Sequence, residues 1–306
     1  MDKTYADTVR LLLAVAPDVF ANDIFAMKGG TAINLFVRDM PRLSVDIDVV
    51  YLPWQTPRDE ALQAINQELA AIAARLAPLG VQTRLVRAKD LGDTKLIVEN
   101  DASQVKIEVN VVFRGSVLPV ERRPLSAKTS DLFGVEFELP VLAPDELYAS
   151  KLVAALDRQH PRDLFDVWQL YESGDISDGM VECFVIYLAG HNRPPHEVLF
   201  GNDKDIAGEY ERAFVGMTEV ECSLETLLEA RVRLRHELPG RLSAQHKQFL
   251  SGLTRAQPDW SLLQCQHAAQ LPALRWKLSN LETFRKRRPE DFTAQADALD
   301  AGLGQA

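Results

Sequence analysis

Two aspartates separated by one residue, Asp46 and Asp48, have the residue type and spacing of a metal-binding pair. They lie in residues 43–51 (LSVDIDVVY), where polar and apolar residues alternate as in a half-buried strand. Both carboxylates and Ser44 would project from one face, with the apolar residues facing a core. Carboxylates ~7 Å apart along a strand repel each other unless a cation lies between them. The pair therefore predicts a site for Mg²⁺ (or Mn²⁺), although Asp-x-Asp also occurs on solvated strand faces and in turns.

A glycine pair upstream has the features of a phosphate-binding turn. Gly29 and Gly30 follow an apolar run at residues 24–27, and Thr31 opens a helix-like segment. Glycines let the backbone approach a ligand closely, and Lys28 adds a positive charge beside them. A lone Gly-Gly is also a common turn. A phosphate cradle followed by a pair of metal-binding acids contains the two components that nucleotidyl transfer requires.

The clearest strand pattern of the chain is residues 104–113, QVKIEVNVVF. Its valines and isoleucine would face a core, while Glu108 lies on the polar face. The alternative for Glu108 is an exposed strand face with cross-strand charge pairs.

A second group of charged residues follows a predicted helix at residues 144–156, which carries Lys151. A proline interrupts the helical pattern, and Arg162 and Asp163 begin the next helix, with Asp166 three residues later on nearly the same face. Taken singly, such a lysine is usually solvated, and an aspartate at a helix start is usually a cap.

These motifs, in this order, resemble the Gly-Gly/Ser … Asp-x-Asp signature of the DNA polymerase β-like nucleotidyltransferases. In finer detail they are similar to the AbiEii/AbiGii abortive-infection toxins, a type IV toxin–antitoxin family. The resemblance covers residues 26–170 and rests on KGGTA, RLSVDID, KLVA and RDLFDV. Thr31 stands where the wider superfamily often has serine, and the hydroxyl is kept.

The resemblance implies a role for each of these residues. Asp46 and Asp48 would bind the metal, with Glu108 as the candidate third acid. Lys151 would contact the triphosphate or assist nucleotide activation. Asp163 or Asp166 would complete the site, without the sequence deciding between the two. The remaining residues would bind the nucleotide: Lys28, Gly29, Gly30, Thr31, Ser44 and Arg162.

The same resemblance implies a bacterial toxin that moves a nucleoside monophosphate from an NTP to an RNA acceptor, the 3′ end of tRNA. It also implies a cognate antitoxin protein or regulator as partner. Two alternatives remain. The acceptor could be a small molecule or a protein hydroxyl, or the chain could be a nucleotide-binding or partner-binding module without chemistry.

The pattern of elements predicts an α+β fold. Residues 1–140 would form a nucleotidyltransferase core with a mixed sheet flanked by helices. Residues 141–306 would form a mainly helical domain that contributes Lys151 and Asp163 or Asp166 to the site. The apolar content of 46% is that of a globular protein, and no apolar run reaches membrane-span length. With a polar start and three widely spaced cysteines, we expect a cytoplasmic protein with no membrane contact.

The net charge of −10 argues against a protein that coats nucleic acid, although a local basic patch is enough to bind RNA. Two stretches are candidates for such a patch: residues 229–236 (EARVRLRH), and residues 275–288 with RWK and FRKRR at their ends. The alternative is that both are solvated helix faces paired with nearby acids. The six histidines show no zinc spacing.

Overall fold

The computed structural model describes residues 3–87 and 93–305. Contacts divide the chain into two compact units, residues 1–147 and 148–306. The change from mixed to helical structure, expected near residue 140, falls at β7, and the division itself lies inside α5.

The first unit contains a mixed sheet, as predicted. Within the described residues it has seven strands in the order β3-β4-β5-β2-β1-β7-β6. The pairs β2–β5 and β1–β7 are parallel, and the other neighbours are antiparallel. The strands are β1 (Phe25–Lys28), β2 (Ile47–Tyr51), β3 (Gln82–Arg87), β4 (Asp93–Glu99), β5 (Gln104–Asn110), β6 (Glu121–Pro124) and β7 (Glu138–Val141).

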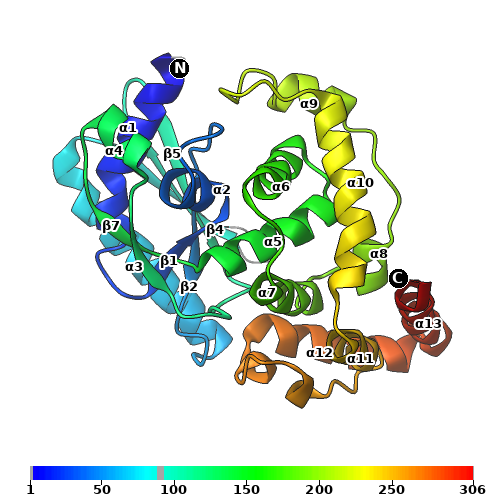
Figure 1. Ribbon diagram of the computed structural model, residues 1–306. Helices are drawn as coiled ribbons and strands as arrows, with labels where there is room; N and C mark the ends of the chain where they lie inside the picture. The colour runs from blue at the N-terminus through cyan, green and yellow to red at the C-terminus, as the bar shows by residue number, and fades with distance from the viewer. Residues whose placement is uncertain (1–2, 88–92, 306) are drawn as a thin grey trace. The chain divides into compact units, whose positions relative to one another are not determined.

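Helices accompany the sheet of this unit, where α1 contacts α3 and β5, and α3 also contacts β3 and β4 (Figure 1). Their apolar faces are buried, because Val9, Leu12 and Ile65 have no exposed surface. The α-helices are α1 (Lys3–Val19), α2 (Gly29–Ala32), α3 (Arg58–Leu76) and α4 (Ala127–Phe133). A π-helix (Ile33–Val37) follows α2, and a 3-10 turn (Ala77–Leu79) follows α3.

The strand expected at residues 43–51 is shorter in the structure, because β2 begins only at Ile47. The residues before it use their backbone groups elsewhere. The Ser44 N–H donates to the Tyr5 hydroxyl, and the Asp46 carbonyl accepts from the Thr31 hydroxyl. These side-chain bonds replace the ladder bonds that would extend the strand.

The strand expected at residues 104–113 also ends early, at Asn110. The Asn110 side chain accepts hydrogen bonds from the N–H groups of Val112 and Phe113, at 3.0 and 2.9 Å, and so turns the chain. Residues 114–140 contain α4 between β6 and β7. Its N-cap is Ser126, which accepts from Thr129 N–H.

The second unit is helical, as predicted. Its apolar helix α7 lies in the core and contacts α8, α11 and α12, while α6 packs on α10 and α12 packs on α13 (Figure 1). The helices after α5 (Pro144–Asp157), which crosses the division, are α6 (Pro161–Ser173), α7 (Asp178–Ala189), α8 (Pro195–Leu199), α9 (Ala207–Ala213), α10 (Leu224–Arg241), α11 (Ala244–Thr254), α12 (Pro272–Arg287) and α13 (Pro289–Gln305). Two 3-10 turns, Trp260–Leu262 and Ala268–Gln270, lie between α11 and α12.

Across residues 3–87 and 93–305, no helix combines the length and the apolar character needed to cross a membrane.

Candidate active site

The glycine turn between β1 and α2 lies against one of the two aspartates. Lys28 at the end of β1 is opposite Asp48 in the antiparallel pairing of β1 with β2. The next residue, Gly29, has φ +77°, and a Cβ atom there would overlap Oδ2 of Asp48. A side chain at this position would therefore meet both backbone strain and a steric clash. The sequence needs glycine here because bare backbone approaches the Asp48 carboxylate.

The hydroxyl groups of Thr31 and Ser44 lie beside this turn. Thr31 is buried, and its hydroxyl donates to the Asp46 carbonyl at 2.5 Å. Its oxygen is 3.0 Å from Ser44 Oγ. Since the Thr31 proton is already used, Ser44 donates in this second contact. A Cβ on Gly30 would come within 3.0 Å of Ser44 Oγ, so Ser44 packs directly on the glycine turn.

The two aspartates flank the buried Ile47, and both are half-buried. Asp48 lies in β2 and Asp46 just before the strand begins, so an extended backbone there would place both carboxylates on one face. Glu108 of β5 pairs with Asp48 in the parallel register of β2, and its carboxylate is held by Lys95 at 2.8 Å. No cluster of three or more acidic, histidine or cysteine side chains suited to a metal occurs among the described residues. The donor set is thus a carboxylate pair, which suits Mg²⁺ bound together with phosphate oxygens.

Two buried side chains that the sequence analysis did not identify, Asn34 and Tyr5, hold this arrangement together. Asn34, in the π-helix, donates to the Gly30 carbonyl at 2.8 Å and accepts from Arg42 N–H at 3.2 Å. Tyr5 of α1 accepts from Ser44 N–H at 3.1 Å. Burial raises the pKa of Tyr5, outweighing the lowering by that N–H and by Arg42. The sequence signal that could have revealed Asn34 is a single polar residue within the apolar run INLFV. In the structure this asparagine is fully buried.

A second cluster forms where α5 meets α6. The Lys151 Nζ lies 2.7 Å from Asp163 Oδ1 and 3.0 Å from Asp166 Oδ2. Lys151 is only 6% exposed, and the two aspartates 0% and 2%. Lys151 is therefore not a solvated surface lysine, and both aspartates bind it. The cap of α6 is His160, whose side chain accepts from Arg162 N–H.

Arg158, which the sequence did not single out, completes this cluster. Its guanidinium binds both oxygens of Asp163, with Nη2 2.9 Å from Oδ1. Burial alone would raise the pKa of Asp163, but Lys151 and Arg158 outweigh it and hold that pKa below its usual range. Arg162 is half-buried at the start of α6.

The sequence-predicted residues thus form two clusters, one in each unit. The first contains the glycine turn, the hydroxyls, the aspartate pair and Glu108. The second contains Lys151 with Asp163 and Asp166, and Arg162 lies on the same helix as these two aspartates.

Comparisons with known proteins give the family. The model of the nucleotidyl transferase AbiEii toxins of type IV toxin–antitoxin systems matches residues 10–280. Among solved structures, the nucleotidyltransferase toxin MenT4 from Mycobacterium tuberculosis is similar, with a TM-score of 0.60 and 17% sequence identity. That likeness covers 92% of this chain and 95% of MenT4, and it shows a shared fold. No curated protein matches the chain. Since the family model spans most of its length, the chain belongs to the AbiEii nucleotidyltransferase toxins of type IV toxin–antitoxin systems.

Proposed function

We propose that this toxin transfers a nucleoside monophosphate from an NTP to an RNA acceptor, the 3′ end of a tRNA, and that the reaction depends on Mg²⁺. The observation that carries the proposal is the contact of the bare Gly29 backbone with the Asp48 carboxylate. It brings a turn that can approach phosphate next to an acid that can bind a cation, so one triphosphate could reach both.

Asp46 and Asp48 would hold the ion, and Mn²⁺ could replace Mg²⁺. When bound, such an ion neutralises phosphate charge and favours deprotonation of an acceptor hydroxyl. Glu108 binds Lys95 through Oε1, so the ion would compete with Lys95 for this carboxylate. The proposal therefore rests on the aspartate pair.

The glycine turn and the hydroxyls would orient the triphosphate. Because Gly29 and Gly30 have no side chains, a phosphate could approach their backbone N–H groups closely. The Ser44 hydroxyl donates to Thr31 and can rotate to donate to a phosphate oxygen. Thr31 keeps its bond to the Asp46 carbonyl and so fixes the backbone beside the acid pair. Lys28, at the end of β1, would add positive charge.

The cluster in the second unit would supply a cation held in one position. Lys151 lies between two carboxylates, so its ammonium keeps one rotamer in the absence of a ligand. On the family likeness, we propose that Lys151 is required to stabilise charge on the phosphates and that Asp163 and Asp166 position it. Arg162 is proposed to bind phosphate. The toxin's partner would be a cognate antitoxin protein.

Transfer of label from each of the four α-labelled NTPs to total bacterial RNA tests the proposal. We compare wild type, Asp46→Ala and, as a matched control, Asp101→Ala, which removes an exposed carboxylate in a turn. Label in a tRNA-sized band that needs Mg²⁺, is lost with Asp46→Ala and remains with Asp101→Ala would support the proposal. Label in protein or in a small molecule would give the reaction a different acceptor. Equal labelling by wild type and Asp46→Ala would remove the catalytic role of the pair.

A further inference from the structure

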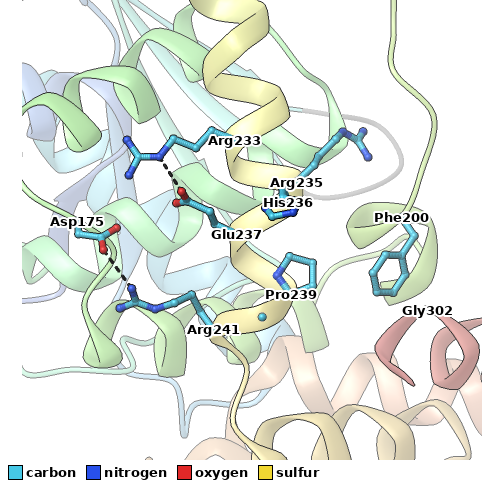
Figure 2. Close-up of a pocket in the computed structure, with 10 residues that line it drawn as sticks. Asp175, Phe200, Arg233, Arg235, His236, Glu237, Pro239, Arg241 and Gly302 are labelled. Carbon is cyan, nitrogen blue, oxygen red and sulfur yellow. Dashed lines mark hydrogen bonds and ion pairs between the residues drawn. The ribbon is translucent and has the colours of Figure 1, made fainter. Parts of the chain in front are cut away.

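The second unit carries two basic surfaces, which differ in whether their basic side chains form ion pairs with acidic residues. The first is a groove of about 780 Å³ along α10, shown in Figure 2. Each of its three arginines already binds a carboxylate: Arg233 with Glu237 at 2.9 Å, Arg235 with Asp203 at 2.9 Å, and Arg241 with Asp175 at 3.1 Å. The three acids offset the charge of the three arginines, so the groove offers little net positive potential to a polyanion.

The second surface is the exposed side of α12. Four exposed cations lie on this helix: Arg275, Arg285, Lys286 and Arg287. None of them takes part in an ion pair with any residue that the structure describes, whereas the neighbouring Arg288 lies 3.7 Å from Asp291. Glu282 is the one acid within α12. The helix therefore carries unmatched positive charge in a chain whose net charge is −10.

An aromatic ring lies beside the first of these charges, and the other three follow about three turns (~15 Å) further along the helix. Trp276 is 52% exposed, which is unusual for so large an apolar side chain. Helical spacing places Trp276, Asn280, Thr283 and Arg287 on one face, and all four are exposed. Arg275 and Lys286 flank this row on one side. We call these six residues the α12 stripe.

The buried side of α12 fixes the stripe on the unit. Lys277 is 6% exposed, and its ammonium donates to the carbonyls of His191, Asn192 and Arg193 at 2.7, 3.3 and 2.9 Å. Leu274 and Leu281 are buried on the same side. Because the helix is anchored, the cations and the ring of the stripe keep a constant spacing.

An exposed ring beside one unmatched cation, with two more about three turns along the same helix and amide and hydroxyl groups between, has the chemistry that binds single-stranded nucleic acid. Bases stack on the ring, and the backbone phosphates lie on the cations. An acidic protein partner would use the cations but would have less need of the ring. The acidity of the rest of the chain would also confine a polyanion to this surface.

We propose that the α12 stripe binds unpaired nucleotides of the RNA acceptor, with a base stacked on Trp276 and phosphates on Arg275, Lys286 and Arg287. The inference rests on the proposed function, since it names the surface that holds the RNA on which the active site acts.

The test measures binding of fluorescein-labelled bacterial tRNA to the full chain carrying Asp46→Ala, which prevents turnover from altering the RNA. Four changes are added in turn: R275Q/K286Q/R287Q, W276A, W276F and the matched control R212Q/R233Q/R241Q. The control also removes three arginines of the second unit, each of them bound to a carboxylate. All changes in the stripe are at exposed positions, so thermal unfolding should coincide with that of the parent.

Removing the three stripe cations should weaken binding about 10-fold or more at low salt and reduce the slope of log K against log salt by about 2. W276A should weaken binding about 10-fold, with W276F close to the parent because a ring remains to stack. The control triple should bind like the parent. A blunt RNA duplex, which has no unpaired bases, should respond to the cation changes but not to W276A.

Stripe variants that bind tRNA as well as the parent would overturn the inference. A loss confined to the control triple would also overturn it, because it would place RNA on the arginines of α9 and α10. Label transfer is measured separately, with the Asp46 side chain restored. Transfer to RNA that does not depend on the stripe would sink the inference and leave the proposed function standing. Binding of tRNA through the stripe without any transfer of label to RNA would support the inference and contradict the proposed function.

Discussion

Lys151 Nζ lies 2.7 Å from Asp163 Oδ1, and both side chains are buried. With Asp166 and Arg158, they form a group of two cations and two anions whose formal charges cancel. Such a group is stable only while it is complete, because removing one member leaves a buried charge without its partner.

Asp163→Asn should therefore destabilise the protein by about 3 kcal/mol. The matched control is Asp7→Asn, which breaks the exposed ion pair with Arg10 and should cost less than about 1 kcal/mol. Urea unfolding at pH 7 would measure both. Equal costs for the two variants would contradict the structural role of the buried group.

The lowered pKa of Asp163 predicts that its contribution to stability depends on pH. Because its pKa is lower in the folded state than in the unfolded chain, its contribution to stability is fully present above the unfolded value of about 3.9. That contribution is lost as the pH falls below this value towards the folded pKa. The difference in unfolding free energy between wild type and Asp163→Asn should therefore stay constant from pH 7 to pH 5 and shrink below pH 4. A constant difference down to pH 3 would argue against the pKa shift.

Gly29→Ala separates backbone strain from contact with the aspartate. Gly29 and Gly80 have nearly the same positive φ, +77° and +72°, but a Cβ on Gly80 would meet nothing within 4 Å. Alanine at either position should cost about 1 kcal/mol or more through φ strain. Only Gly29→Ala should displace the Asp48 carboxylate, so it alone should reduce nucleotidyl transfer, by about 100-fold for a misplacement near 1 Å. Label transfer and thermal unfolding of the two variants test this expectation, and an active Gly29→Ala enzyme would contradict it.

Tyr5→Phe removes the acceptor of the Ser44 N–H without changing the ring. We expect a loss of about 1 kcal/mol in stability, because the N–H of the half-buried Ser44 loses its acceptor, and a raised KM for the NTP as Ser44 shifts. Tyr171→Phe is the control, since its buried hydroxyl has no partner among the described residues and its loss should cost little. Steady-state transfer kinetics and urea unfolding would distinguish them. An unchanged KM would limit Tyr5 to a structural role.

The lowered pKa of Lys277 predicts that the stability of the protein changes with pH in the alkaline range. Burial lowers its pKa to about 8, below the value of about 10.5 for an unfolded chain. Between these values the unfolded chain binds more protons than the folded one, so this residue makes stability rise with pH. Relative to Lys277→Met, wild type should therefore gain roughly 1–2 kcal/mol between pH 8 and pH 9.5. Guanidinium unfolding at pH 8 and pH 9.5 measures the unfolding free energies of both proteins. The same change in unfolding free energy for wild type and Lys277→Met would contradict the prediction.

The sequence predicted the mixed sheet and the helical second half, because each leaves a local signal. The resemblance of the motifs, not a local signal, singled out the candidate residues of the two clusters, and their roles stay predictions. Alternation placed β5, and Pro161 with the acids around it placed the break between α5 and α6. The ends of β2 and β5 were not predictable from alternation. They depend on side chains, Tyr5 and Asn110, that take up backbone groups after the chain has folded. The sequence does not identify Arg158, because its contact with Asp163 forms only when α5 and α6 pack together.

The short strand β6 has a consequence for how the protein behaves at high concentration. It ends the sheet, opposite β3 in the strand order, and exposes Glu121 and Arg122 before closing on Pro124, which has no N–H to donate. A strand edge of this kind offers a second molecule only charged side chains and an interrupted row of donors. The β6 edge of the sheet is therefore a poor template for pairing with a strand of a second molecule.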